Sequence, residues 1–141
     1  MKRKENGNHV VPLSRQALAV VGELHPLTGN DALLFPGARS RTRPISDNTL
    51  NAALRRLDIG QHEHVAHGFR HTASTLLNEQ RGFDPDLIET QLHHADRTMR
   101  GKYNGAKYFD ERRRMMQAWA DYLDGLRATD GQTVVPFRAT A

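Results

Sequence analysis

The sequence predicts a mainly α-helical fold with a small β-hairpin or sheet near the amino end. Several segments carry apolar residues every three or four positions, the spacing of an amphipathic helix. One short β-branched segment near the start is bounded by turn-forming residues, as strands are. The 141 residues, 38% of them hydrophobic, suffice for one modest core.

The first elements are a strand and a helix. HVVPL at 9–13 is predicted to be the strand. Ser14 is a good amino-terminal cap for a helix over 14–25. The apolar face of that helix is formed by Leu18, Val21 and Leu24.

A loop and a second helix follow. Prolines and glycines in quick succession predict a loop over 25–45, with one short extended piece, LLF. Ser46 or Asp47 is expected to cap the next helix, which ends near Leu57. The apolar face of this helix is formed by Leu50, Ala53, Leu54 and Leu57.

The second half is expected to be almost wholly helical. Asp84–Pro85 is a strong start signal, because Asp caps a helix and Pro is tolerated at its first position. The predicted helices cover 67–80, 84–94, a short segment around Tyr103, and 108–126. The last has an apolar stripe, more typical of a core than of a catalytic site, formed by Met115, Met116, Trp119, Tyr122, Leu123 and Leu126.

The charged residues favour an anionic partner. The chain has 20 Lys and Arg against 16 Asp and Glu, a net charge of +4, and all but four of the basic residues are arginine. The guanidinium binds phosphate in bidentate fashion, and a basic surface releases counterions from nucleic acid. A GC-rich genome would produce the same composition, so the motifs must decide.

Composition excludes several other classes. Without cysteine the chain has no disulfide, no thiolate zinc site and no cysteine nucleophile. No stretch approaches the roughly 18 apolar residues of a membrane helix, and the basic start lacks the apolar stretch of a signal peptide. We therefore expect a cytoplasmic protein with no membrane partner.

Three motifs carry side chains suited to phosphate chemistry. HGFR opens a predicted helix at His67, LHH ends one at His94, and Tyr103 follows nine residues later. His67 and Arg70 share one helical face near the positive end of the dipole, where a phosphate is favoured. An imidazolium at a helix carboxyl end can donate to a phosphoryl oxygen, and a tyrosine can attack phosphorus.

These motifs, in this order and spacing, resemble the carboxy-terminal catalytic domain of the tyrosine recombinases, or phage integrase family, in particular its satellite-phage type. NHVVPLSRQAL, LFPG, LNAALRRL and YNGAKYFDERRRMMQAWADYLD fit the same group. The similarity spans about residues 1–126, and 127–141 is expected to be a tail. The resemblance implies the recombinase catalytic-core fold and site-specific DNA cleavage and rejoining with no metal, ATP or other cofactor. The absence of a P-loop motif agrees.

The resemblance also implies a role for each motif residue. Tyr103 corresponds to the nucleophile that forms a 3′-phosphotyrosyl bond and releases a 5′-hydroxyl. Arg70 corresponds to the residue that stabilises transition-state charge. His67 serves proton transfer or phosphate contact, and His94 hydrogen-bonds the scissile phosphate.

Further basic residues are candidates for the leaving group and for DNA. The family uses a lysine on a β-hairpin before PLS to protonate the leaving 5′-oxygen; Lys2 is the first candidate and Lys4 the alternate. The run Arg112–Arg114 is interpreted as a solvated face, with DNA contact as the alternative. The candidate DNA contacts are Lys4, Arg41, Arg43, Arg100 and Lys102.

The chain departs from the family pattern in two places. His93 stands where the family has glycine in LGH, and no TGxR segment, which carries the family's first catalytic arginine, occurs. We therefore expect a partial catalytic domain with weak or no recombination. A catalytically inert DNA-binding remnant is the alternative.

Histidines at 62, 64, 67 and 71 raise a different possibility, a metal-dependent enzyme. His67 and His71 have the spacing of a zinc helix, but HEHVAH is out of register for HExxH and no carboxylate ligand is obviously placed. We favour no metal site and expect His71 to pack or hydrogen-bond beside the phosphate site. The expected partner is double-stranded attachment-site DNA, bound by a homotetramer of the parent enzyme, whereas the isolated chain is expected to be a monomer.

Overall fold

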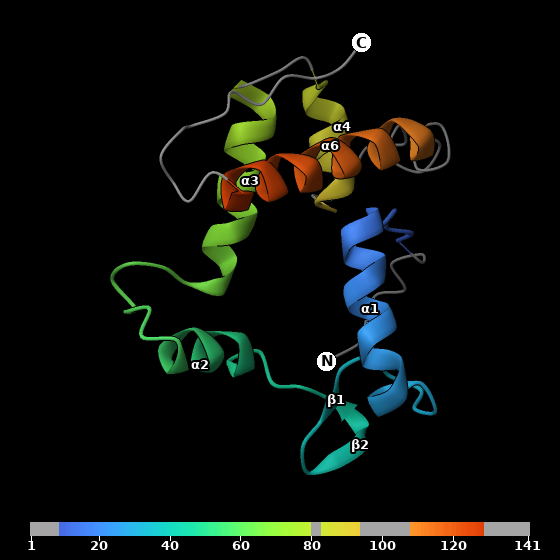
Figure 1. Cartoon of the computed structure of the whole chain (residues 1–141), viewed down its shortest axis with the longest axis vertical. Helices are drawn as coiled ribbons and strands as arrows, with labels where there is room; N and C mark the ends of the chain where they lie inside the picture. The colour runs from blue at the N-terminus through green and yellow to red at the C-terminus, as the bar shows by residue number, and fades with distance from the viewer. Residues whose placement is uncertain (1–8, 80–82, 94–107, 129–141) are drawn as a thin grey trace, which may run out of the picture. The chain divides into compact units, whose positions relative to one another are not determined.

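The computed structural model describes residues 9–79, 83–93 and 108–128. Its elements are α1 (Arg15–Thr28), β1 (Pro36–Gly37), β2 (Ser40–Pro44), α2 (Thr49–Arg56), α3 (Ala66–Glu79), α4 (Pro85–Gln91) and α6 (Phe109–Ala128) (Figure 1). The chain divides into two compact units: unit 1 is Met1–Arg15 with Ala73–Ala141, and unit 2 is Gln16–Thr72. The predicted fold class, mainly helical with a small antiparallel sheet, is confirmed.

Unit 1 contains the apolar core. The buried side chains come from the second half of α3, from α4 and from α6, which lies against α4 (Figure 1). They are Leu77, Leu87, Ile88 and Met115. Each buried side chain of this size stabilises the fold by about 1.5–3 kcal/mol relative to an exposed one.

The predicted start of α4 and the apolar stripe of α6 are confirmed. The Asp84 side chain accepts a hydrogen bond from the Asp86 N–H at 2.9 Å, and Pro85 occupies the first helical position. On α6, Met115 is fully buried, and Met116, Trp119 and Tyr122 pack against the same core. Leu123 is the exception on this stripe, since it is 44% exposed.

The strand predicted at 9–13 is wrong. These residues form no strand, and Val10 and Val11 are exposed. The segment is fixed by other contacts: the Val10 carbonyl accepts from Arg112 Nη2 at 2.6 Å, and His9 Nε2 lies 3.3 Å from the Gln91 carbonyl oxygen. A β-branched run reaches strand geometry only where another strand can pair with it.

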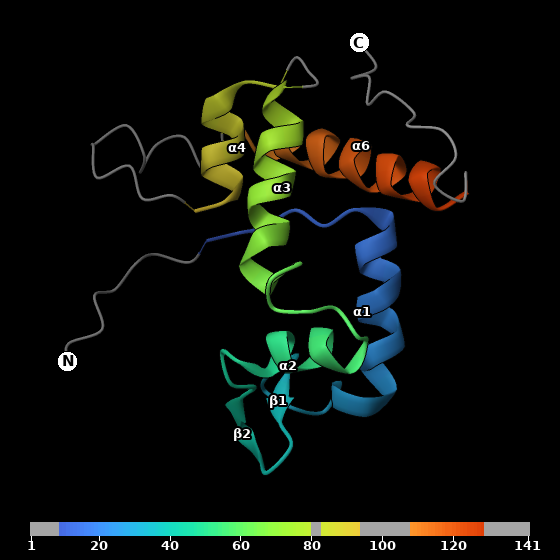
Figure 2. The same cartoon turned by 90° about the vertical axis from the view of Figure 1, so that its left-hand side faces the viewer.

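The sheet lies instead inside the segment predicted as a loop. β1 and β2 pair antiparallel (Figure 2). Gly37 lies opposite Ser40 and Pro36 opposite Pro44, and the register shifts between Pro36 and Gly37. Proline cannot donate to a strand ladder, but both strands of a two-stranded sheet are edges, where proline is tolerated. The prolines and glycines taken as signs of a loop therefore belong to a hairpin.

The boundaries of α1 and α2 also differ from the predictions. α1 starts directly after Ser14, as predicted, but continues past Pro26, and the Thr28 hydroxyl hydrogen-bonds to the Leu24 and Leu34 carbonyls at its end. α2 starts after Asn48 rather than after Ser46 or Asp47. The Ser46 hydroxyl instead pairs with the Thr49 hydroxyl at 2.9 Å.

Candidate functional site

The HGFR motif lies on the first turns of α3, as predicted. His67 is exposed and Arg70 is half-buried, and their spacing puts both on one face of the helix. The Ala66 N–H, one of the free donors at the start of this helix, donates to Asn51 Oδ1 of α2 at 2.9 Å. A side chain of α2 thus fixes where the motif begins.

Hydrogen bonds from Arg55 hold the loop between α2 and α3 in place. Its guanidinium donates to the Ile59 carbonyl and, at 2.8 Å, to the His64 carbonyl. Just beyond α2 and its C-cap Leu57, Asp58 is left-handed, at φ 61°, and the Asp58 and Ile59 N–H groups donate back to carbonyls of the last turn. The carboxyl end of α2 therefore sets the path of the chain into the HGFR motif.

Gly68 is required by a close approach within the motif. A Cβ at this position would lie 2.8 Å from the His64 ring. That ring also meets the Phe69 ring edge-on, with 4.2 Å between centroids. Because His64 occupies the space next to Gly68, a larger residue there would displace the ring.

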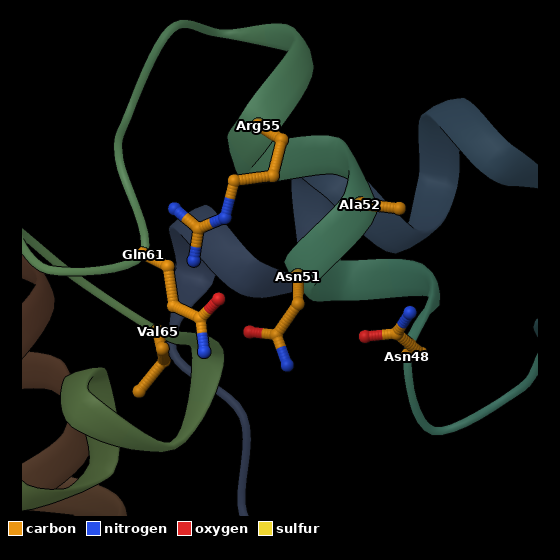
Figure 3. Close-up of a pocket in the computed structure, with 6 residues that line it drawn as sticks. All are labelled: Asn48, Asn51, Ala52, Arg55, Gln61 and Val65. Carbon is orange, nitrogen blue, oxygen red and sulfur yellow. The ribbon is translucent and has the colours of Figure 1, made fainter.

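A polar pocket of about 370 Å³ adjoins this region. Arg55, Asn51 and Gln61 point into the same space, and Asn48, Ala52 and Val65 complete the lining (Figure 3). Its three amide side chains can both donate and accept hydrogen bonds. None of these residues was singled out from the sequence, since amides on a short helix are equally typical of solvent-exposed positions.

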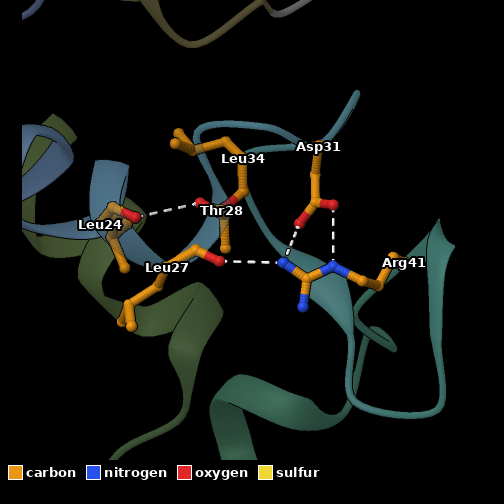
Figure 4. A network of polar contacts seen from close by, with 6 residues as sticks. All are labelled: Leu24, Leu27, Thr28, Asp31, Leu34 and Arg41. Carbon is orange, nitrogen blue, oxygen red and sulfur yellow. Dashed lines mark hydrogen bonds and ion pairs between the residues drawn. The ribbon is translucent and has the colours of Figure 1, made fainter.

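Arg41, a candidate DNA contact expected in a loop, lies in β2. Its guanidinium forms a bidentate pair with Asp31, at 2.8 and 2.6 Å, and also donates to the Leu27 carbonyl at 2.9 Å (Figure 4). The hydrogen bond and the charge of Asp31 raise the pKa of Arg41 above its ordinary value. This pair offsets part of the charge that Arg41 would offer to a phosphate. Arg43, two residues along the same strand, is exposed.

The first two residues of the LHH motif, Leu92 and His93, follow α4, and His93 makes a left-handed turn. His93 has a φ of 52°, and its N–H donates to the Thr90 carbonyl at 3.2 Å, which closes the helix. Glycine adopts this conformation without steric cost, so a glycine at this position, as in LGH, has a physical reason. The His93 ring lies on the His9 ring, with centroids 4.4 Å apart.

Arg112 contradicts the interpretation of the Arg112–Arg114 run as a solvated face. Only 1% of Arg112 is exposed, whereas Arg113 and Arg114 are exposed and pair with Asp110 and Glu111 one turn back. Arg112 Nε donates to Gln91 Oε1 at 2.8 Å, and Nη2 donates to the Val10 carbonyl. Burial lowers the pKa of Arg112.

The remaining candidate residues lie outside the described residues; they are Lys2, Lys4, His94, Arg100, Lys102 and Tyr103. His71, expected to pack or hydrogen-bond beside the site, is exposed rather than packed, and it makes an interaction of its own. Within residues 9–79, 83–93 and 108–128, no three His, Cys, Asp or Glu side chains are grouped as metal ligands would be. In the same part of the chain, no helix combines the length and apolar character needed to cross a membrane.

Comparison with known proteins adds independent information. The phage integrase family matches residues 1–109. The prophage integrase IntA of Escherichia coli (strain K12) is 42% identical over 135 residues, which cover 95% of this chain and 32% of that protein. The integrase of Enterobacteria phage P4 is 45% identical over 127 residues, 88% of this chain and 28% of that protein. The chain thus spans about a third of the length of these relatives. No solved structure matches it.

Proposed function

Because the chain belongs to the phage integrase family, we propose that it carries catalytic residues for site-specific DNA strand cleavage and rejoining. The observation that carries the proposal is the position of His67 and Arg70 on one face of the first turns of α3, within the residues that the family matches. A cation and an imidazole beside a helix amino terminus suit a phosphate.

Cleavage begins with the nucleophile. The Tyr103 hydroxyl oxygen attacks the scissile phosphorus while His67 receives its proton. The bond from phosphorus to the 5′-oxygen breaks, and a 3′-phosphotyrosyl bond takes its place. The departing 5′-oxygen receives a proton from Lys2 or Lys4 and leaves as a hydroxyl. Rejoining reverses these steps and needs no ATP, because the phosphotyrosyl bond conserves the energy of the phosphodiester.

The charge that develops on the phosphoryl oxygens is stabilised by Arg70 and by His94, which donates a hydrogen bond to the phosphate. Positioned cations of this kind stabilise the negative charge that magnesium ions stabilise in other phosphoryl-transfer enzymes. The proposed reaction therefore uses no metal or other cofactor. No TGxR segment, which carries the family's first arginine, lies within these 141 residues, so we propose that these residues by themselves act without that charge. A missing charge of this kind slows cleavage on the order of 10²–10³-fold.

The partner is double-stranded attachment-site DNA. Arg43, Arg100 and Lys102 contribute phosphate contacts. Arg41 contributes less, because its charge is paired with Asp31. Residues 1–126 act as the partial catalytic domain and 127–141 as a tail; the isolated chain is a monomer, and the parent enzyme is a homotetramer on DNA. Light scattering with and without DNA measures this assembly.

Covalent trapping tests the proposal. The chain is incubated with a nicked duplex whose cleaved end is lost, so that a phosphotyrosyl adduct accumulates as a shifted band on a denaturing gel. Tyr103→Phe removes the nucleophilic oxygen, and we expect no adduct from it. Tyr122→Phe is the matched control, since Tyr122 packs against the core and beside Trp119, and its adduct should persist.

Each other outcome of the trapping experiment has a clear meaning. DNA binding without any adduct contradicts cleavage and favours an inert DNA-binding remnant. An adduct that survives Tyr103→Phe means that another residue is the nucleophile. Loss of activity with EDTA would instead favour a metal-dependent enzyme.

A further inference from the structure

Arg112 is a buried cation. Its side chain is 1% exposed, and no carboxylate of the described residues lies within ion-pair distance. Burying a charge without an opposite charge is costly, and an apolar residue of similar size is usually as stable or more so. An arginine at this position of α6 is therefore expected to have a role other than stabilising the core.

The hydrogen bonds of Arg112 indicate that role. Arg112 Nη2 donates to the Val10 carbonyl at 2.6 Å, and Nε donates to Gln91 Oε1 at 2.8 Å. The two acceptors belong to segments that are far apart in the sequence, the one before α1 and the carboxyl end of α4. A lysine ammonium also has several N–H donors, but they share one nitrogen and lack the fixed planar geometry that directs Nε and Nη2 at two separate acceptors.

The same two segments meet a second time. His9 Nε2 lies 3.3 Å from the Gln91 carbonyl oxygen, and the His9 and His93 rings are 4.4 Å apart. All of these residues belong to unit 1. Arg112 is the buried member of this group and hydrogen-bonds to both segments. The contact between the His9 and His93 rings joins the same two segments a second time.

We infer that Arg112 is a positioning residue that holds the segment following Lys2 and Lys4 against the segment leading into His94. Val10 is six residues after Lys4, and Gln91 is three residues before His94. Arg112 itself is nine residues after Tyr103, on the helix that follows it. The inference rests on the proposed function, because these residues are the proposed acid, phosphate ligand and nucleophile. Arg112 touches neither DNA nor the reacting atoms and acts through the chain that it holds.

The test compares Arg112→Lys with Arg127→Met, which alters an exposed arginine on the same helix. With Arg112→Lys, we expect adduct formation at saturating DNA to slow on the order of 10²-fold, because small displacements of catalytic groups have large effects on rate. Affinity for the duplex should stay nearly unchanged. Amide hydrogen exchange should accelerate in residues 9–14 and 91–93. Arg127→Met should behave as the unsubstituted chain does.

A change of leaving group separates positioning from general damage. In a duplex with sulfur in place of the scissile 5′-oxygen, the leaving thiolate needs no acid, because a thiol is a far stronger acid than an alcohol. If Arg112 positions the lysine, the Arg112→Lys variant should recover much of its rate on this DNA. An equal loss on both substrates, or unchanged exchange in residues 9–14 and 91–93, overturns the inference.

Two controls keep the result interpretable. If Arg112→Lys does not fold, as circular dichroism would show, Gln91→Met replaces it, with adduct rate at saturating DNA and amide exchange as its readouts. No loss of rate and no faster exchange in Gln91→Met would likewise overturn the inference. If the unsubstituted chain forms no adduct, the proposed function fails, and amide exchange alone then decides whether Arg112 holds the two segments.

Discussion

The two units of the chain are stabilised by different forces. Unit 1 buries apolar side chains of α3, α4 and α6 around Met115, together with Arg112. Unit 2 buries no residue, and Leu27 and Leu57 are about two-thirds exposed. Its links are polar: Arg41 to Asp31 and to a backbone carbonyl, Arg55 to the loop after α2, and Asn51 to the start of α3.

The two kinds of contact have different effects: apolar burial in unit 1 provides most of the stability, and polar contacts in unit 2 fix the local conformation of the chain. Apolar burial is the dominant favourable contribution to folding, whereas a hydrogen bond contributes a net 0.5–1.5 kcal/mol or so. Unit 2 should therefore open locally at a lower free energy than unit 1. The polar links of unit 2 fix the conformation of the chain around the HGFR motif. Hydrogen bonds suit this role because they are directional, although each contributes little free energy.

The largest expected effect is at the centre of the unit 1 core. Met115→Ala removes a fully buried side chain and should lower the free energy of unfolding by about 2–5 kcal/mol. Leu50→Ala, at a position 56% exposed in unit 2, should change it by no more than about 0.5 kcal/mol. Denaturant titration followed by circular dichroism measures both. Equal losses would show that unit 2 depends on apolar burial as much as unit 1 does.

A smaller and local effect is expected at Arg55. Arg55→Met leaves the Ile59 and His64 carbonyls without their donor and should lower the local stability of residues 57–66 by about 1–3 kcal/mol. Amide hydrogen exchange measures this residue by residue. Arg56→Met, an exposed neighbour, is the control and should change nothing. Faster exchange in residues 83–93 as well would mean that the two units do not open separately.

The smallest effect concerns a feature that both units share. His93 in unit 1 and Asp58 in unit 2 adopt left-handed backbone at a helix end. His93→Gly and Asp58→Gly should each stabilise that turn by about 1 kcal/mol. We expect the gain at 93 in denaturant titration and the gain at 58 in local hydrogen exchange. His93→Ala keeps the Cβ and should give no gain; a gain from it would trace the cost to the imidazole instead.

The sequence predicted features that depend on nearby residues. The start of α4 follows from Asp84 and Pro85 alone, and the helix predicted over 67–80 is α3, Ala66–Glu79. The sequence did not predict the hairpin of β1 and β2. Its prolines favour a loop, but proline is also tolerated in an edge strand. Nor did the sequence predict that Arg112 is buried while Arg113 is exposed, since that depends on partners 21 and 102 residues away.

For the candidate site, sequence spacing placed His67 and Arg70 on one helix face, and the described α3 has both there. The supports of that face were not predictable. Asn51 and Arg55 act through backbone groups, and no motif distinguishes an arginine that binds a carbonyl from one that faces solvent. Spacing does not show where Tyr103 and His94 lie relative to each other, and their roles stay predictions.

The hydrogen bond between Val10 and Arg112 has a consequence for the order of events during protein synthesis. Its two residues are 102 positions apart, whereas the polar links described in unit 2 join residues at most 15 apart. At typical elongation rates Val10 waits roughly 5–20 s on the ribosome before its partner is made. Unit 2 can assemble in that interval, so the segment around Val10 is fixed in place after unit 2.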